Sequence, residues 1–308
     1  MDCVPLGFRR EFLLDFQNTR HRLVHTFIRN LCQDGIKLDT WIRFPDFSIA
    51  EIAEKLLIEM DEAGIDVATP LAVDMEYCQK YEGNTKPYLQ QVEETAAICR
   101  AINHRSGRRR LMPFIGADPN RPGMSELVID QITSGSYFGV KIYPVMGFIP
   151  NDPRLHPIYE FCQSKNLPIT AHCENGGLPG FSGYYDSAHP EKWRPVLEQF
   201  PRLTLNLAHN DKTGSPWQDA IASLMETYSN VYTDISFDTE MFYMPGRYFS
   251  NIKRILSTPK LQDRILWGTD WYMGRFLWTE ASYLEWFRRY SRKIFWCPVR
   301  FSELDLQR

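Results

Sequence analysis

The sequence predicts an α/β fold made of parallel βα units, within a single domain that covers residues 1–308. Three observations lead to this prediction. Seven short runs are continuously apolar, as strands buried on both faces of a parallel sheet are. Amphipathic helical patterns lie between these runs. The chain has no low-complexity tract or linker, and its length is slightly above the usual size of one α/β barrel.

The predicted elements alternate along the chain. The strands cover residues 66–73, 111–117, 138–143, 167–172, 203–209, 231–236 and 265–269. The helices cover residues 48–63, 88–104, 125–133, 153–165, 190–199, 216–228 and 277–290. Ser48, with Glu51 three residues later, forms a capping-box pattern at the start of the first of these helices. Asp152 followed by Pro153 is typical of a helix start as well.

Seven strands are one fewer than a closed barrel of this kind requires. The residues before the first predicted helix contain no clear strand, and residues 10–31 have a helical pattern. Three interpretations remain open: an open sheet, a strand that the pattern does not reveal, or a first strand that is missing from the N-terminal end.

Composition narrows the class of protein. The net charge of -3 gives no electrostatic reason to expect binding to nucleic acid or to an anionic membrane. The seven cysteines are scattered without a C-x-x-C pair, which indicates free thiols in a reducing compartment. No apolar run approaches the ~18 residues of a membrane span. Charges at Arg9, Arg10 and Glu11 argue against a signal peptide. We therefore expect a cytoplasmic protein whose partner is a small molecule.

Ionisable residues close five of the apolar runs. They are Lys141, His172, His209, Asp234 and Asp270. In a parallel barrel the active site lies at the carboxyl ends of the strands. Imidazole and carboxylate groups suit zinc or a similar divalent ion, which can activate water. Taken singly, His172 could be a hydrogen-bonded core histidine and Asp270 could cap the next segment, but their joint placement favours a site.

Two of these five residues have other interpretations. Asp234 is expected to support hydrogen bonding near the site and not to bind metal. Lys141 could bind a phosphate or carboxylate, could be carboxylated to bridge two metal ions, or could simply form a salt bridge.

Four motifs at these strand ends carry a resemblance to a known family. GVKIYPVMGFIPNDPRL (139–155), PITAHCENGG (168–177), LAHND (207–211) and ILWGTDW (265–271) together resemble the amidohydrolase-related family that includes the aminocarboxymuconate-semialdehyde decarboxylase branch. The similarity runs from residue 66 to residue 270, with a weaker match at CPVRFSEL (297–304). It implies a (β/α)8 TIM-like barrel with an H-x-H motif on its first strand.

The resemblance also implies roles for three residues. His172 would be a metal ligand, and His209 would be a second-site ligand or the acid/base group. Asp270 would bind metal or accept a proton from water. The ion would be zinc, with manganese as the alternative.

The chain departs from the family pattern because it contains no H-x-H motif. Its opening MDCVPLGF resembles the segment that follows that motif, so Met1 is interpreted as an internal methionine just past a missing first strand. His21 and His25 share a helix face, but Leu23 and Val24 between them favour helix packing over a replacement metal site.

Three loops with many aromatic or apolar residues would surround the site. They cover residues 144–150, 173–188 and 237–249, and they could line a pocket for a small organic substrate or pack on one another. Arg247 and Arg275 are candidates to bind a substrate carboxylate.

The sequence leaves two classes of function open. The first is a metal-dependent hydrolase of a C–N or C–O bond, with a decarboxylase on the same site as a close variant. The second is a barrel without catalysis that serves as a binding or scaffold protein, because the H-x-H ligands are absent. A barrel lacking one strand would expose sheet edges, so we also expect reduced stability and association into homo-oligomers.

Overall fold

A six-stranded parallel sheet forms the centre of the computed structural model, which describes residues 47–77, 86–176, 182–211, 213–236, 240–271 and 279–293. Its strands pair in chain order as β1-β2-β3-β4-β5-β6, and every neighbouring pair is parallel. The strands are β1 (Phe114–Ala117), β2 (Gly139–Ile142), β3 (Ile169–His172), β4 (Leu205–Ala208), β5 (Val231–Asp234) and β6 (Ile265–Leu266). This arrangement confirms the predicted α/β class and the parallel βα units, and it is consistent with a partial (β/α)8 barrel.

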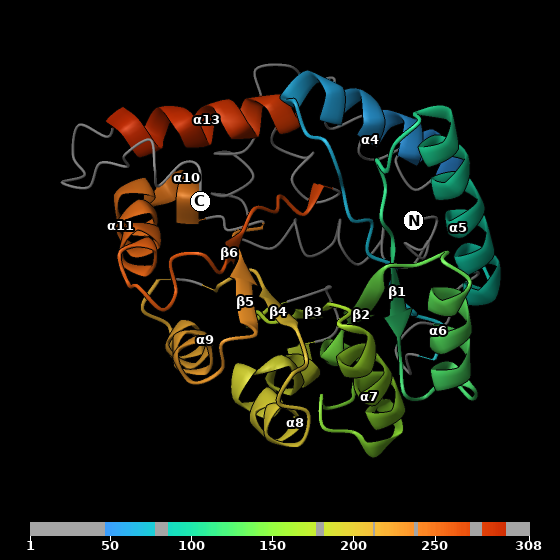
Figure 1. The fold of residues 1–308 in the computed structure, drawn as a ribbon. Coiled ribbons are helices and arrows are strands. Elements are labelled where there is room, and N and C mark those ends of the chain that lie inside the picture. The colour runs from blue at the N-terminus through green and yellow to red at the C-terminus, as the bar shows by residue number, and fades with distance from the viewer. Residues whose placement is uncertain are drawn as a thin grey trace.

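Helices surround the sheet as an outer ring (Figure 1). The longer ones are α4 (Ile49–Ala63), α5 (Tyr88–Arg105), α6 (Met124–Thr133), α7 (His156–Lys165), α8 (Arg194–Gln199), α9 (Pro216–Thr227), α11 (Pro245–Leu256) and α13 (Glu280–Lys293). Short helical turns lie between them: η2 (Pro144–Met146), η3 (Pro153–Leu155), η4 (Ser182–Ala188), η5 (Pro190–Trp193) and α10 (Glu240–Tyr243). Successive strands are thus connected through helices on the outside of the sheet.

The predicted strand at residues 66–73 lies beside β1 without becoming a continuous strand. Ala68 pairs with Leu111 and Leu71 with Phe114, both in parallel, and backbone hydrogen bonds of 2.9–3.1 Å join the two segments. The ladder is interrupted because Pro70 has no N–H to donate. Six of the seven predicted strands therefore form the sheet, and the seventh segment adds an interrupted edge to it.

The approach of this segment to β1 explains a glycine. A Cβ at Gly116 would lie 2.6 Å from the carbonyl oxygen of Ala72, well inside van der Waals contact. Only glycine allows the two backbones to lie this close. Within the described residues, neither this segment nor β6 has a further strand paired to its outer side. The predicted helix at residues 10–31, with His21 and His25, lies outside the described residues.

The core lies between the sheet and the helices. Every residue of β1, β2, β3 and β4 is buried, as their continuously apolar sequences predicted. The helices contribute their apolar faces to the same core, with Tyr159, Trp193 and Leu224 almost fully buried. At the start of α4 the capping box forms as expected: Ser48 accepts from the Glu51 N–H, and Glu51 accepts from the Ser48 N–H at 2.8 Å.

The structure corrects one predicted loop. Residues 237–249 were expected to be irregular, but they contain α10 and the start of α11. Pro245 occupies the first turn of α11, where its missing N–H costs no hydrogen bond. The apolar residues that stabilise this helix extend beyond the predicted loop to Ile252, Ile255 and Leu256, which are buried on one face. The last strand, β6, is also shorter than the predicted strand at residues 265–269.

None of the described helices combines the length and the apolar composition that a membrane span requires.

Candidate metal centre

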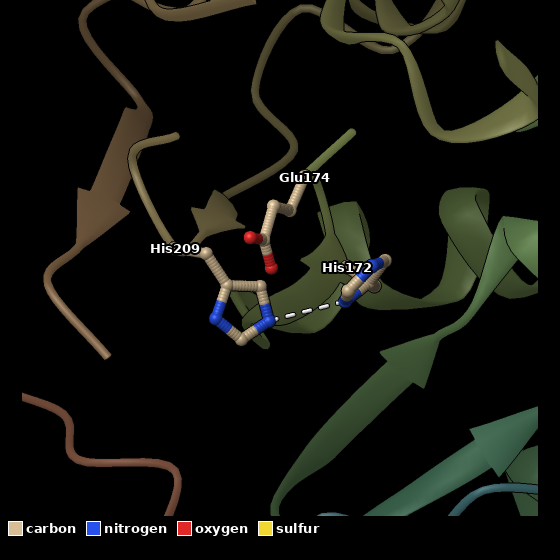
Figure 2. A group of neighbouring side chains, drawn as sticks. All are labelled: His172, Glu174 and His209. Atoms are coloured by element: carbon tan, nitrogen blue, oxygen red, sulfur yellow. Dashed lines mark hydrogen bonds between the residues drawn. The ribbon is translucent and has the colours of Figure 1, made fainter. Parts of the chain in front are cut away.

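Two histidines meet at the carboxyl ends of neighbouring strands. His172 is the last residue of β3, and His209 directly follows β4, whose Ala208 is paired with His172. Because the two strands are parallel, both side chains emerge at the same end of the sheet. Nδ1 of His172 lies 3.1 Å from Nε2 of His209 (Figure 2). The structure thus brings together two of the three predicted metal ligands.

The outward nitrogen of each ring is held by a polar neighbour. Nε2 of His172 lies 3.0 Å from the carbonyl oxygen of Gly176. Nδ1 of His209 lies 3.1 Å from the carbonyl oxygen and 3.0 Å from the hydroxyl of Ser236. Metal-binding histidines are usually oriented in this way, by a backbone carbonyl or carboxylate on the nitrogen that does not bind the ion. The inner nitrogens are therefore fixed towards each other.

Asp234 organises the segment that carries His209. Its carboxylate accepts hydrogen bonds from the backbone N–H of His209 at 3.0 Å, from Nδ2 of Asn206 at 2.7 Å and from Ser236. Burial would raise the pKa of Asp234, but the nearby charge of His209 and these hydrogen bonds outweigh it and hold the pKa below its ordinary value. Asp234 thus makes hydrogen bonds next to the candidate site, as the sequence predicted, and its supporting role there stays a prediction.

The backbone is unusual where the candidate residues project. His209, Asn210 and Asp211 have φ angles of 81°, 48° and 46°, and Asp270 has a φ of 49°. Non-glycine residues rarely occupy this left-handed region, and when they do the surrounding structure must hold them there. Two of the four are site residues predicted from the sequence, so the backbone at both strand ends is held in a conformation that local preference disfavours.

Burial controls the charge of the groups at this end of the sheet. Loss of hydration lowers the pKa of His172 well below its ordinary value, and the charges of His209 and Lys141 lower it further. His172 is therefore neutral and has a nitrogen lone pair available. Lys141 is 5% exposed, and burial lowers its pKa against the opposing charges of Asp234, Asp270 and Cys173. No carboxylate of the described residues lies within ion-pair distance of Lys141, so the salt-bridge interpretation is not supported there.

Glu174 is a candidate ligand that the sequence analysis missed. Ligand atoms of His172, Glu174 and His209 all lie within 4.8 Å of one another, and Figure 2 shows the Glu174 carboxylate beside the His209 ring. The available signal was the spacing of Glu174 two residues after His172, since alternate residues of an extended segment point to the same side.

The donor set fits a divalent ion. Two nitrogens each about 2.0–2.1 Å from one zinc ion, at an angle of roughly 90–110°, are about 2.9–3.4 Å apart. The 3.1 Å between the inner nitrogens of His172 and His209 falls in this range. Two imidazoles with one carboxylate are also a common ligand set for catalytic zinc.

The other predicted site residues are not part of the group formed by His172, Glu174 and His209. Asp270 lies outside the three-residue group and is exposed, although enough protein surrounds it to raise the pKa of its carboxyl. It remains within electrostatic range of His209 and Lys141. Arg247 forms an ion pair with Glu240, with 3.4 Å between Nε and Oε1, and donates to the carbonyl oxygen of Thr213. Arg275 lies outside the described residues.

The fold and the paired histidines define a protein of the (β/α)-barrel class with a candidate metal centre at the carboxyl ends of its strands. The sequence model of the amidohydrolase family matches residues 38–291, so the chain belongs to this family, whose members are metal-dependent. This confirms the resemblance inferred from the four motifs. A search of curated proteins finds no match.

Two solved structures illustrate the likeness in fold. An uncharacterized TIM-barrel protein from Bordetella bronchiseptica is 22% identical, with a TM-score of 0.58, over 92% of this chain and 86% of that chain. The 4-oxalomesaconate hydratase from Rhodopseudomonas palustris is 13% identical, with a TM-score of 0.53, over 84% of this chain and 78% of that chain. At these identities the comparisons show the shared barrel fold alone.

Proposed function

We propose that this chain is a metal-dependent hydrolase of the amidohydrolase superfamily that acts on a small organic substrate. The observation that supports the proposal is the pair of inner nitrogens on His172 and His209, 3.1 Å apart, with Glu174 beside them. We infer that these three residues hold one divalent ion, zinc or alternatively manganese, and that Asp270 completes the site. Glu174 would compensate for the ligands that family members carry on the H-x-H motif.

The residues of the chain have distinct tasks in this proposal. A divalent ion, when bound, supplies Lewis-acid activation of a substrate oxygen or of water. His209 is held at Nδ1 by Ser236, so its Nε2 is oriented towards the ion as a ligand, and proton transfer is left to Asp270. The carboxylate of Asp270, which is within electrostatic range of His209, would accept a proton. Lys141, buried and without a carboxylate partner among the described residues, offers a cation for an anionic group of the substrate.

A decarboxylase on the same site is the second candidate. The buried Lys141 favours it, because a cation near the ion would orient a substrate carboxylate that is to be lost. The two reactions are separated by product analysis on candidate lactones, amides and aromatic acids. Release of CO2 identifies decarboxylation, whereas an opened lactone or amide identifies hydrolysis. Arg247 and Arg275 remain candidates for binding a carboxylate in either case.

The first experiment measures metal stoichiometry after loading with zinc or manganese and desalting. We expect about one retained ion in the full chain and none in His172→Ala. His104→Ala is the matched control, because it removes an exposed helical histidine and should keep the ion. Failure of the unmodified chain to retain an ion would contradict the proposal and would favour the binding or scaffold alternative.

A further inference from the structure

Asp270 is held through hydrogen bonds of its two neighbours in the chain. Thr269 donates from Oγ1 to Oε1 of Glu280 at 2.5 Å, and Trp271 donates from Nε1 to Oε2 of Glu59 at 2.9 Å. Within the described residues, the Asp270 carboxylate itself accepts no hydrogen bond and forms no ion pair. Asp270 has a φ of 49°, a conformation uncommon for non-glycine residues, and the hydrogen bonds of its two neighbours stabilise the backbone there.

The two carboxylates belong to helices at opposite ends of the described chain. Glu59 lies on α4 and Glu280 on α13, and these two helices contact each other on the outer ring, where Figure 1 shows them meeting at their ends. The backbone N–H of Glu280 also donates to Oε2 of Glu59 at 3.2 Å. Oε2 of Glu59 thus accepts hydrogen bonds both from the Trp271 side chain and from the first residue of α13.

Simple packing does not require these carboxylates. Glu59 and Glu280 are only 4% and 5% exposed, and each accepts a side-chain hydrogen bond from a neighbour of Asp270. Burying a carboxyl group is unfavourable unless it makes specific hydrogen bonds. Burial, together with the charge of Glu59, raises the pKa of Glu280 to about 7. An apolar residue at either position would pack at lower cost but would leave Thr269 or Trp271 without an acceptor.

We propose that Glu59 and Glu280 are positioning residues that set the backbone at Thr269, Asp270 and Trp271 and so aim the Asp270 carboxylate at the metal centre. This inference rests on the proposed function, because it assigns Asp270 to that centre. We call Glu59 and Glu280, with their hydrogen bonds to Trp271 and Thr269, the clamp on Asp270. Because Glu59 lies on α4 and Glu280 on α13, the clamp would make the geometry of the site depend on how these two helices pack.

The test compares variants that remove or keep the hydrogen bond between Thr269 and Glu280. Thr269→Val and Glu280→Leu remove it, whereas Glu280→Gln keeps an amide oxygen as acceptor. Glu285→Leu is the matched control, since Glu285 is exposed on the same helix. Two quantities are measured in the full-length chain: the dissociation constant for Mn2+, followed by its electron paramagnetic resonance signal, and hydrogen exchange of the segment 265–271.

We expect Thr269→Val and Glu280→Leu to weaken Mn2+ binding about tenfold, at the lower end of what mutations behind metal ligands cause. Exchange of the segment 265–271 should become faster in the same two variants. Glu280→Gln and Glu285→Leu should match the unmodified chain in both measurements. In an Asp270→Asn background, Glu280→Leu should have no further effect on Mn2+ binding, which distinguishes positioning from general destabilisation.

The outcomes separate this inference from the proposed function. If the unmodified chain binds no Mn2+, the proposed function fails. If it binds Mn2+ with unchanged affinity in Glu280→Leu, or if Glu280→Leu weakens binding equally with Asp270→Asn present, the positioning role is overturned and the metal centre stands.

Discussion

At the scale of single residues, the site depends on which nitrogen each histidine turns towards its neighbour. Gly176 and Ser236 hold the outer nitrogens, and the inner nitrogens of His172 and His209 are left facing each other. A proton can be shared between them, or an ion can take its place at a similar separation. Neutral His172 favours the second arrangement, because it does not have to lose a proton before binding an ion.

Glu174 is the third proposed ligand of the metal centre, beside His172 and His209. We predict that Glu174→Gln weakens zinc binding at least tenfold, because the neutral amide is a poorer ligand than a carboxylate. Isothermal titration with zinc measures this. Glu191→Gln, which changes an exposed glutamate on η5, should leave the affinity unchanged. Equal affinity in both variants would remove Glu174 from the ligand set.

Asp234 should affect stability as well as the site. Asp234→Asn replaces an acceptor of several buried hydrogen bonds with a group that is itself partly a donor. We expect the free energy of unfolding to fall by roughly 1–3 kcal/mol, as for other buried donors left without a partner. Urea unfolding measures the change, with the exposed Asp263→Asn as control. An unchanged unfolding midpoint would show that the buried network tolerates the amide.

The pKa of Glu280 predicts how stability changes with pH. Its pKa is about 7 in the folded chain against an ordinary value of 4.5, so the folded chain holds a proton that the unfolded chain has lost between these values. The free energy of unfolding should therefore fall as pH rises through this window, by roughly 3 kcal/mol at most. Urea unfolding at about pH 5 and about pH 8 should show a smaller decrease in Glu280→Gln. Equal pH dependence in both proteins would contradict the raised pKa.

At the scale of elements, the helices differ in how far their start is set by a local signal and how far by packing. The capping box of α4 satisfies two backbone groups, and its buried face carries Ile52, Leu56 and Met60. The helix α11 differs from α4, because it has no side-chain cap and is stabilised by the packing of one buried apolar face. This difference explains why α4 was predicted and α11 was not.

The cap of α4 can be tested directly. Ser48→Ala should lower the free energy of unfolding by about 1 kcal/mol, because the N–H of Glu51 loses its acceptor. Ser223→Ala, at an exposed position within α9, should change it by less than about 0.5 kcal/mol. Urea unfolding of the two variants provides the comparison. A smaller effect at Ser48 than at Ser223 would mean that packing alone determines where α4 begins.

At the scale of the whole molecule, the described sheet has two edges. β6 pairs only with β5 among the described residues, and its Leu266 and the adjacent Trp267 are 40% and 41% exposed. Exposed apolar residues beside an unpaired strand favour association with another chain. We therefore propose that copies of this chain associate through this edge.

Light scattering over a range of concentrations tests association. We expect the mean mass to rise with concentration, and Leu266→Lys to reduce this rise by placing a charge on the edge. Ile58→Lys, at an exposed position on α4, should not reduce it. A monodisperse monomer that melts cooperatively at high temperature would contradict both the association and the reduced stability expected from the open sheet.

Local chemistry made the strands and two of the proposed ligands predictable. Continuous apolar runs mark strands buried on both faces, and a parallel sheet brings their carboxyl ends together, so His172 and His209 could be placed before any coordinates. The capping box and the proline-initiated helices are likewise properties of short segments. The segment at residues 66–73 was only partly predicted correctly. It lies beside β1 as expected, but Pro70 has no N–H to donate and the strand is interrupted there.

Contacts between distant residues could be read only from the three-dimensional structure. Which ring nitrogen faces inward depends on Ser236 and Gly176, and the inclusion of Glu174 depends on how the chain turns after β3. The clamp on Asp270 joins Glu59 to Trp271 and Glu280 across most of the described chain. Such contacts leave no periodic pattern in a sequence, because they form only after the sheet and its ring of helices have brought the residues together.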